Sequence, residues 1–86
     1  MPEISRFYGI VIGMWYDDHN PPHFHAVYAG HKAKIRIDPP GLLDGSMPRR
    51  ALAFIKEWAV AHREELMVNW NRRTSALPLL KITPLE

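Results

Sequence analysis

The sequence predicts an α+β fold, with a small, mostly antiparallel β-sheet and one long α-helix packed across a face. Two observations support this fold class. Residues 7–38 hold three runs of the apolar, β-branched and aromatic residues typical of strands, whereas residues 49–73 contain no Gly or Pro and repeat apolar residues at helical spacing. Strands that come before one helical run are typical of α+β domains. At 86 residues, the chain is predicted to form a single domain, 1–86, with one modest core.

Composition limits the function classes. The chain is 47% hydrophobic and 23% charged, as globular proteins are. It has no cysteine, which excludes disulfides, thiolate nucleophiles and zinc sites with sulfur ligands. No stretch approaches the roughly 20 apolar residues that span a bilayer, and the first residues lack a signal-peptide pattern. We therefore expect a cytoplasmic protein with no membrane partner, whose weak positive charge of +2 permits an acidic partner.

The first strand is predicted over residues 7–16. Apolar residues occupy both alternating sets of positions, so both faces of the strand are expected to be buried in a central position of the sheet. Gly9 and Gly13 share one face and either leave room for close approach of a helix or mark a bend.

An antiparallel hairpin follows, with strands predicted over residues 23–29 and 32–38 and a tight turn between them. Lys32, Lys34 and Arg36 share one face of the second strand, while the apolar residues between them join the core. Alternating lysines often only keep a sheet face soluble. They would otherwise contact a phosphate or a partner protein.

The long helix is predicted over residues 47–73. Ser46 suits the N-cap, and Pro48 is tolerated in the first turn because a helix leaves that N–H unpaired. At 100° per residue one side of this helix is apolar. The residues on that side are Leu52, Ile55, Trp58, Ala59, Leu66 and Trp70.

His62 interrupts this apolar side. The commoner explanation for a buried histidine is a neutral ring satisfied by a backbone carbonyl or by a neighbour such as Asn69. Alternatively, the helix crosses the sheet near its corner and brings His62 toward His23 and His25, with Glu65 as the group that orients its ring. Beyond the helix, residues 78–82 are predicted to form a short final strand or a docked extension.

The segment Asp17 to His25 holds the densest group of titratable side chains in the chain. His23 and His25 lie two residues apart, so on a strand their side chains leave the same face with Cα atoms roughly 6.5 Å apart. Phe24 would then point the opposite way, into the core. The double proline before them stiffens the approach. This arrangement suits either a metal or catalytic site or a structural polar corner.

As a metal site, the segment would use His23 and His25 as ligands, assisted by His19 or Asp18. Imidazole and carboxylate ligands suit Zn, Mn, Fe or Ni, and the spacing does not choose among these metals. We expect the histidines to be exposed, so that replacing them with Ala leaves the stability of the metal-free protein nearly unchanged. As a structural corner, Asp17, Asp18 and Asn20 would only accept hydrogen bonds from local backbone donors.

A catalytic hypothesis uses the same groups in a metal-assisted or histidine-driven phosphodiesterase acting on RNA or DNA. Hydrolysis of a phosphodiester needs an activator of the nucleophile, an acid for the leaving group and cations for the developing charge. Lys34 and Arg36 would supply cations. The candidate catalytic residues are Asp18, His19, His23, His25 and His62.

Several strings resemble a known family. They are Ile-Ser-Arg-Phe-Tyr-Gly-Ile-Val-Ile from Ile4, Asp-His-Asn-Pro-Pro-His-Phe-His-Ala from Asp18, Pro-Arg-Arg-Ala-Leu from Pro48, and His-Arg-Glu-Glu-Leu from His62. Together they are similar to the small bacterial family called domain of unknown function 4160. Its members are commonly encoded beside another short protein. The resemblance therefore implies the toxin half of a toxin–antitoxin pair, with a small acidic protein encoded nearby as the partner.

Two further function classes remain open. The protein would be a non-catalytic binding module if its long helix or a sheet edge docks a partner, with exposed Trp15 or Trp70 as interface anchors. It would be a nucleic-acid binder without catalysis if binding weakens steeply with salt.

Overall fold

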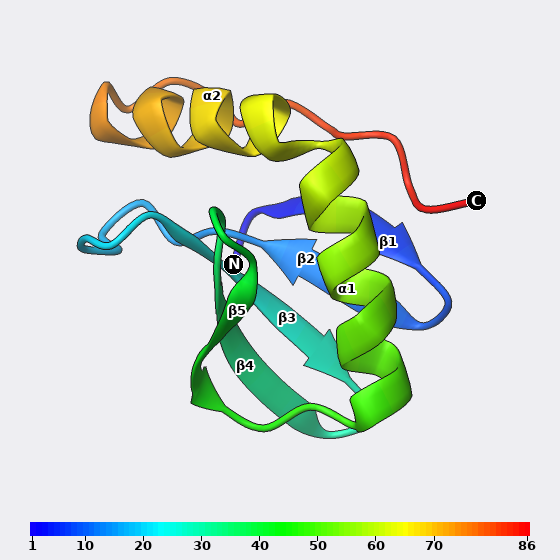
Figure 1. Cartoon of the computed structure of the whole chain (residues 1–86). Helices are drawn as coiled ribbons and strands as arrows, with labels where there is room; N and C mark the ends of the chain where they lie inside the picture. Colours follow the sequence, from blue (N-terminus) through cyan, green and yellow to red (C-terminus); the bar gives the residue numbers. More distant parts are fainter.

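The computed structural model describes all residues, 1–86, as a five-stranded sheet followed by two helices. The strands pair antiparallel in chain order, β1-β2-β3-β4-β5 (Figure 1). This confirms the α+β class. The elements are β1 (Glu3–Phe7), β2 (Ile10–Gly13), β3 (His23–Tyr28), β4 (His31–Arg36), β5 (Gly41–Gly45), α1 (Arg49–Ala61) and α2 (Arg63–Thr74).

The predicted first strand, 7–16, is wrong in its boundaries, because the chain reverses inside it. Tyr8 and Gly9 both have positive φ, 51° and 79°, as in the two-residue turns that match the twist of a hairpin. Gly13 lies where the N-terminal segment crosses, since a Cβ there would lie 2.5 Å from the carbonyl oxygen of Pro2. The two glycines therefore mark a turn and a close approach of backbone, and not a helix contact.

The second hairpin follows the prediction, with Ala29 and Gly30 in its turn at φ 47° and 84°. Phe24 pairs with Ile35, and both are fully buried beneath the helices. β4 ends at Arg36, two residues earlier than predicted, and β5 completes the sheet beside it. The register places His25 opposite Lys34 on the other face.

The single helix predicted over 47–73 is two helices that meet at His62. Its φ and ψ of −118° and 25° are not helical, and the chain turns there (Figure 1). One straight helix from 49 to 73 would be about 37 Å long, longer than the largest dimension of the molecule, 34 Å. Pro48, and not Ser46, holds the N-cap position. Neither helix combines the length and hydrophobicity that crossing a bilayer requires.

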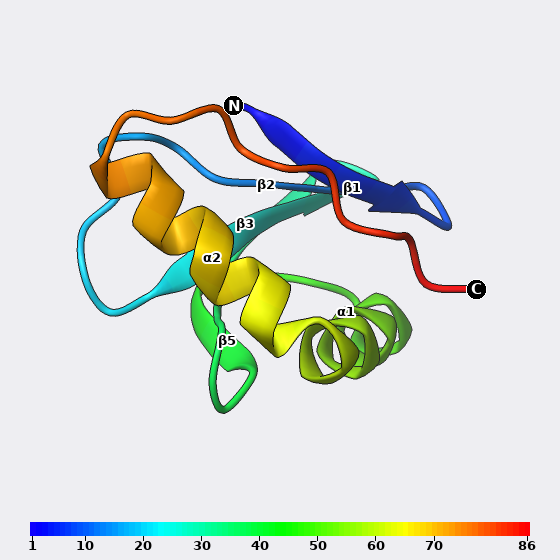
Figure 2. The same cartoon turned by 90° about the horizontal axis from the view of Figure 1, so that it is seen from above.

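The core lies between the sheet and both helices. The Trp58 ring of α1 is its centre, with ring centroids 5.4 Å from Phe7 of β1 and 5.8 Å from Phe24 of β3. α2 covers one end of the sheet and buries Leu66 and Trp70 there (Figure 2). The two helices thus share one core but cover different parts of it.

The C-terminal segment is a docked extension and contains no strand. It runs back beside β1, where the Ile82 N–H donates to the carbonyl of Ile4 at 2.8 Å (Figure 2). The Asn69 side chain donates to the carbonyl of Leu80 at 2.9 Å and accepts its N–H at 2.8 Å. These bonds attach the extension to both β1 and α2.

Candidate functional site

Asp18, His23 and His25 form one compact group, called here the Asp–His cluster. The loop between β2 and β3 brings Asp18 back over the start of β3, where the two histidines begin the strand. His25 Nε2 lies 3.0 Å from both carboxylate oxygens of Asp18, and His23 Nε2 lies 3.5 Å from Oδ1. One nitrogen or oxygen of each side chain lies within 4.8 Å of the others. Two imidazoles and one carboxylate therefore converge on a single point.

His23 is held in a defined tautomer. Its Nδ1–H donates to the carbonyl of Pro21 at 2.8 Å, which leaves the lone pair on Nε2 in the neutral ring. That Nε2 is buried and has no hydrogen-bond partner, since 3.5 Å to Asp18 is too long for one. The lone pair of His23 Nε2 and a lone pair of the Asp18 carboxylate thus face each other in a buried place. A cation, either a proton or a metal ion, would relieve this arrangement.

Asp18 is kept ionised by its neighbours. Burial alone would raise the pKa of this carboxyl. The hydrogen bond from His25, the backbone N–H of Trp15 and, when the rings are protonated, the charges of His25 and His23 outweigh burial, so the pKa of Asp18 is lowered. The bond from Trp15 is also the local backbone contact that a structural corner would make. Asp18 therefore shapes the loop and faces both rings as an anion.

α2 packs against the cluster and binds the loop that carries Asp18. The ring of Trp70 packs against His23 with centroids 5.3 Å apart, and the Arg73 guanidinium lies 3.7 Å from the centroid of Trp70. Arg73 Nη1 donates to the carbonyls of Tyr16 and Asp18 at 2.8 and 2.7 Å. A buried cation from the helix thus anchors the loop that carries Asp18.

Arg73 and Trp70 were not assigned to the site from the sequence. Arg73 lies three residues after Trp70, which places it on the apolar side of the helix. It is only 7% exposed. A charged residue in an apolar stripe is the signal that would have identified it, because a buried charge needs specific partners.

His19 lies at the rim of the site and outside the cluster. It is exposed, as are Asp17 and Asn20 beside it. These residues surround a hollow of about 500 Å³, called here the corner hollow. Its lining includes Asp18, His19, Asn20, His23, Lys34 and Asp44. Of the predicted metal ligands, Asp18 thus joins the two strand histidines, and His19 does not.

His62 is also outside the cluster. It lies at the joint of α1 and α2, where its Nδ1 is 2.7 Å from a Glu65 oxygen and its ring packs on Trp58 at 5.6 Å. Glu65 is thus its partner, whereas Asn69, which was expected to satisfy a buried neutral ring, binds the C-terminal extension instead. The helix does not bring His62 to the strand histidines.

The three basic side chains predicted to share one strand face, those of Lys32, Lys34 and Arg36, lie on two different surfaces. Lys32 and Lys34 are exposed and line a hollow together with His25. Arg36 lines a different hollow, between the double proline and α2. Only the two lysines therefore share a surface with the cluster.

The expectation that both histidines are exposed is wrong for His23. Its side chain is 5% exposed and that of His25 is 16% exposed. The reason is α2, whose Trp70 covers the His23 ring. Replacing His23 with Ala would leave a cavity beside Trp70, so unfolding of that variant says nothing about metal binding.

The comparisons with known proteins identify a family but no function. No curated protein matches the chain, and no solved structure matches it. The family model described as a domain of unknown function, DUF4160, matches residues 9–71, which include the Asp–His cluster, Lys34 and His62. This match extends over most of the chain, and the protein therefore belongs to the DUF4160 family.

Proposed function

We propose that the Asp–His cluster binds one divalent transition metal ion and that the protein hydrolyses phosphodiester bonds in a nucleic acid. The observation that carries the proposal is the buried, unpaired Nε2 of His23, which faces the Asp18 carboxylate at 3.5 Å while Pro21 holds the other ring nitrogen. A backbone carbonyl on the second nitrogen is the usual arrangement behind a metal-ligating histidine.

The donor set suits Zn, Mn, Fe or Ni. Two imidazole nitrogens and one carboxylate oxygen form a common three-ligand set that leaves positions open for water and substrate. Ligand atoms around such an ion lie about 3.5 Å apart, close to the spacing of the cluster atoms, so small side-chain movements would complete the site. When bound, the ion would supply a Lewis acid and lower the pKa of its water.

The surrounding residues would take the other parts of the reaction. Lys34 lines the corner hollow with His23 and would bind the phosphate and stabilise its developing charge. His19, exposed at the rim, would be within reach of a leaving group in that hollow. His62 has no part in this proposal because it lies at the helix joint.

The proposal extends to a toxin-like role in the cytoplasm, which a nuclease activity would explain. The absence of cysteine is compatible with a reducing compartment.

The test is isothermal titration of the metal-free protein with Zn, Mn, Fe(II) and Ni at neutral pH. We expect one ion to bind per chain, and Asp18→Asn or His25→Ala to weaken binding by at least a hundredfold. His62→Ala is the matched histidine control and should bind as the wild type does. Wild-type protein that binds none of the four ions would instead identify the cluster as a structural polar corner.

Activity is tested separately, with labelled RNA and DNA oligonucleotides and each metal that binds. We expect cleavage by the wild type and by His62→Ala, and none by Asp18→Asn. Cleavage that persists in Asp18→Asn and His25→Ala would show that the cluster is not the active centre.

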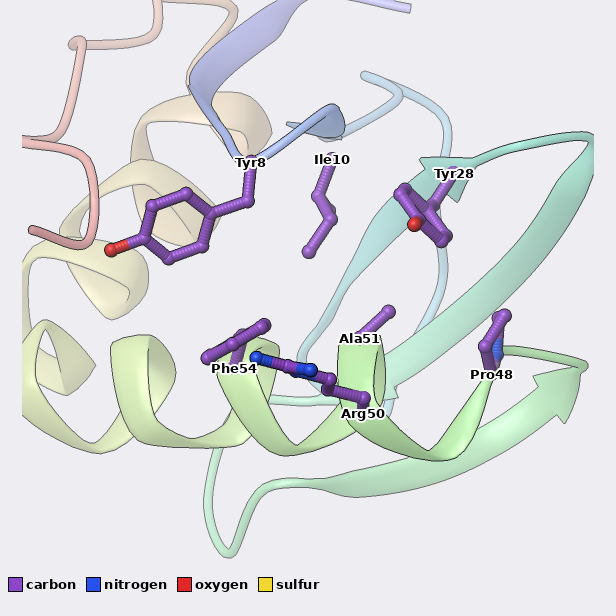
Figure 3. Close-up of a pocket in the computed structure, with 7 residues that line it drawn as sticks. All are labelled: Tyr8, Ile10, Tyr28, Pro48, Arg50, Ala51 and Phe54. Carbon is purple, nitrogen blue, oxygen red and sulfur yellow. The ribbon is translucent and has the colours of Figure 1, made fainter.

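A second candidate function, binding of a small acidic protein encoded nearby, is favoured by an aromatic pocket at the opposite end of the sheet. This pocket of about 510 Å³ lies between the β1–β2 turn, the end of β3 and the start of α1. In Figure 3, Tyr8 and Tyr28 stand on either side of Ile10, and Arg50 reaches from α1 toward Phe54. The lining residues are Tyr8, Ile10, Tyr28, Pro48, Arg50, Ala51 and Phe54.

The pocket combines exposed aromatic surface with unopposed positive charge. Tyr8 is 52% exposed, and the Arg50 guanidinium lies 5.7 Å from the Phe54 ring centroid. The first turn of α1 carries Arg49 and Arg50 and no acidic residue, at the helix end that already has positive character. Tyrosine and arginine often dominate binding energy at interfaces, and an acidic segment would complement this surface.

Co-expression with the neighbouring short protein, followed by size exclusion, tests this second function. We expect the two proteins to co-elute, and Arg50→Glu to separate them. Lys56→Glu, a charge reversal farther along α1, is the control and should leave the complex intact. Two folded proteins that elute apart would remove this candidate.

A further inference from the structure

The sheet face opposite the helices carries a hollow whose lining comes entirely from strands, loops and the N-terminus. This hollow of about 400 Å³ is called here the open-face hollow. α1 packs on the other face, through Trp58 and Phe24 (Figure 1). The side chains that give the open-face hollow its character are Met1, Trp15, His25, Lys32, Lys34 and Asp44.

Two lysines give the open-face hollow positive charge. Lys32 and Lys34 are exposed, and they lie two residues apart on β4, so their side chains leave the same face roughly 6.6 Å apart at Cα. Neither lysine forms an ion pair within the protein. A row of unpaired cations along one strand is complementary to the phosphate backbone of a nucleic acid.

Trp15 adds an aromatic surface to the same hollow. It is 46% exposed, whereas Trp58 and Trp70 are buried. Its backbone is fixed by the turn with Asp18, since the Trp15 N–H donates to Asp18 Oδ2 at 3.0 Å and its carbonyl accepts the Asp18 N–H at 3.2 Å. An exposed indole beside lysines is the arrangement on which unstacked bases bind in single-strand-binding proteins.

The open-face hollow lies beside the corner hollow. Lys34 and Asp44 line both, and they are register partners on β4 and β5. His25 belongs to the first hollow and His23 to the second, while both rings face Asp18. The backbone of a nucleic-acid strand bound across the open face would therefore pass close to the Asp–His cluster.

Asp44 is placed where it would distinguish single-stranded RNA from single-stranded DNA. A carboxylate beside Lys34 repels phosphate, but it can accept a hydrogen bond from a ribose 2′-hydroxyl, which DNA lacks. A duplex is disfavoured because its bases are stacked and cannot reach Trp15.

We propose that the open sheet face binds single-stranded RNA, with a base stacked on Trp15, phosphates on Lys32 and Lys34, and a 2′-hydroxyl on Asp44. This inference rests on the proposed function, because it names the substrate class of the nuclease centre. Binding itself needs no metal, so it can be measured apart from hydrolysis.

The experiment uses fluorescence anisotropy of a labelled 12-nucleotide RNA with the full chain in EDTA, where no cleavage occurs. The same sequence as single-stranded DNA and as duplex RNA supplies the comparison. We expect single-stranded RNA to bind at least tenfold more tightly than either, and Asp44→Ala to remove the preference over DNA. Equal binding of duplex and single strand would overturn the proposal.

Three variants test the assigned contacts. Lys32→Gln with Lys34→Gln should weaken RNA binding at least tenfold and reduce its salt dependence, and Trp15→Ala should weaken it roughly 5- to 100-fold. Lys56→Gln, which removes one lysine charge on the exposed side of α1, is the control for a charge lost elsewhere and should change little. If the lysine pair behaves as Lys56→Gln does, or if Trp15→Ala binds normally, the inference is wrong.

The outcomes distinguish this inference from the proposed function. RNA binding that depends on Trp15 and the lysines, without metal binding or cleavage, would support the open face and contradict the nuclease centre. Metal-dependent cleavage that does not change in Trp15→Ala would support the centre and contradict the open face.

Discussion

Asp18 is the residue on which the cluster depends, because it faces both histidine rings and also holds the Trp15 turn. Its pKa is lower in the folded protein than the usual value of about 3.9 in an unfolded chain. The carboxylate therefore stabilises the fold at every pH above that usual value. This contribution is lost as the pH falls through the lower pKa of the folded protein, because below it Asp18 is protonated in both the folded and the unfolded protein.

We predict that Asp18→Asn lowers the free energy of unfolding at pH 5 and that the difference from wild type narrows as the pH falls below about 4. Urea unfolding of the metal-free proteins at several pH values measures this difference. Asp17→Asn, an exposed neighbour without a hydrogen bond, is the control. A difference that stays constant down to pH 2 would show that the charge of Asp18 does not stabilise the fold.

At the scale of elements, α2 both covers one end of the sheet and holds the loop that carries Asp18. Its buried side chains are Leu66, Asn69, Trp70 and Arg73, and three of these contact the loop, the His23 ring or the C-terminal extension. The turn at His62 makes this possible, because it directs α2 across the end of the sheet while α1 stays on its face.

We predict that Arg73→Leu lowers the free energy of unfolding by about 2–4 kcal/mol, because two buried carbonyls lose a charged donor. It should also weaken metal binding by about tenfold, as loss of groups behind ligands commonly does. Chemical unfolding and metal titration measure the two effects.

Arg63→Leu is the control on the same helix. Its ion pair with Asp38, at 3.4 Å, is more than half exposed and should contribute little. Arg73→Lys keeps the charge but lacks the planar guanidinium, so partial recovery of metal affinity is expected. Full metal affinity in Arg73→Leu would show that the loop keeps its position without α2.

For the whole molecule, the C-terminal extension completes the core of a small domain. Ile82 is 4% exposed, and the Trp58 indole N–H donates to the carbonyl of Thr83 at 2.9 Å. Removing residues 77–86 would expose the Ile82 site and leave the Trp58 and Asn69 polar groups buried without partners.

We predict that a chain ending at Ala76 is largely unfolded at 37 °C. The lost burial and the unpaired groups together amount to roughly 4–8 kcal/mol, which approaches the total stability of a domain of this size. Circular dichroism during heating measures it. Ile82→Ala is the milder variant and should lower stability by about 2–4 kcal/mol, and a truncated chain that melts with the wild type would contradict this role.

Local pattern was enough to predict the α+β class and the hairpin of β3 and β4, and it left a final strand and a docked extension as alternatives for residues 78–82. Each depends on residues close in sequence or on one periodicity. The same reasoning predicted that His23 and His25 share a strand face. The turn at Tyr8 and Gly9 was missed because strand periodicity continues through it in apolar residues, and a two-residue reversal leaves that pattern almost unchanged.

The tertiary structure alone decided which groups meet. The apolar side of the helical run continues from Ala59 to Leu66 without a break in phase, so periodicity could not reveal the turn at His62. That turn places Trp70 on His23 and keeps His62 away from the cluster. Convergence of side chains depends on the path of the backbone between them, and spacing along one element carries no information about that path.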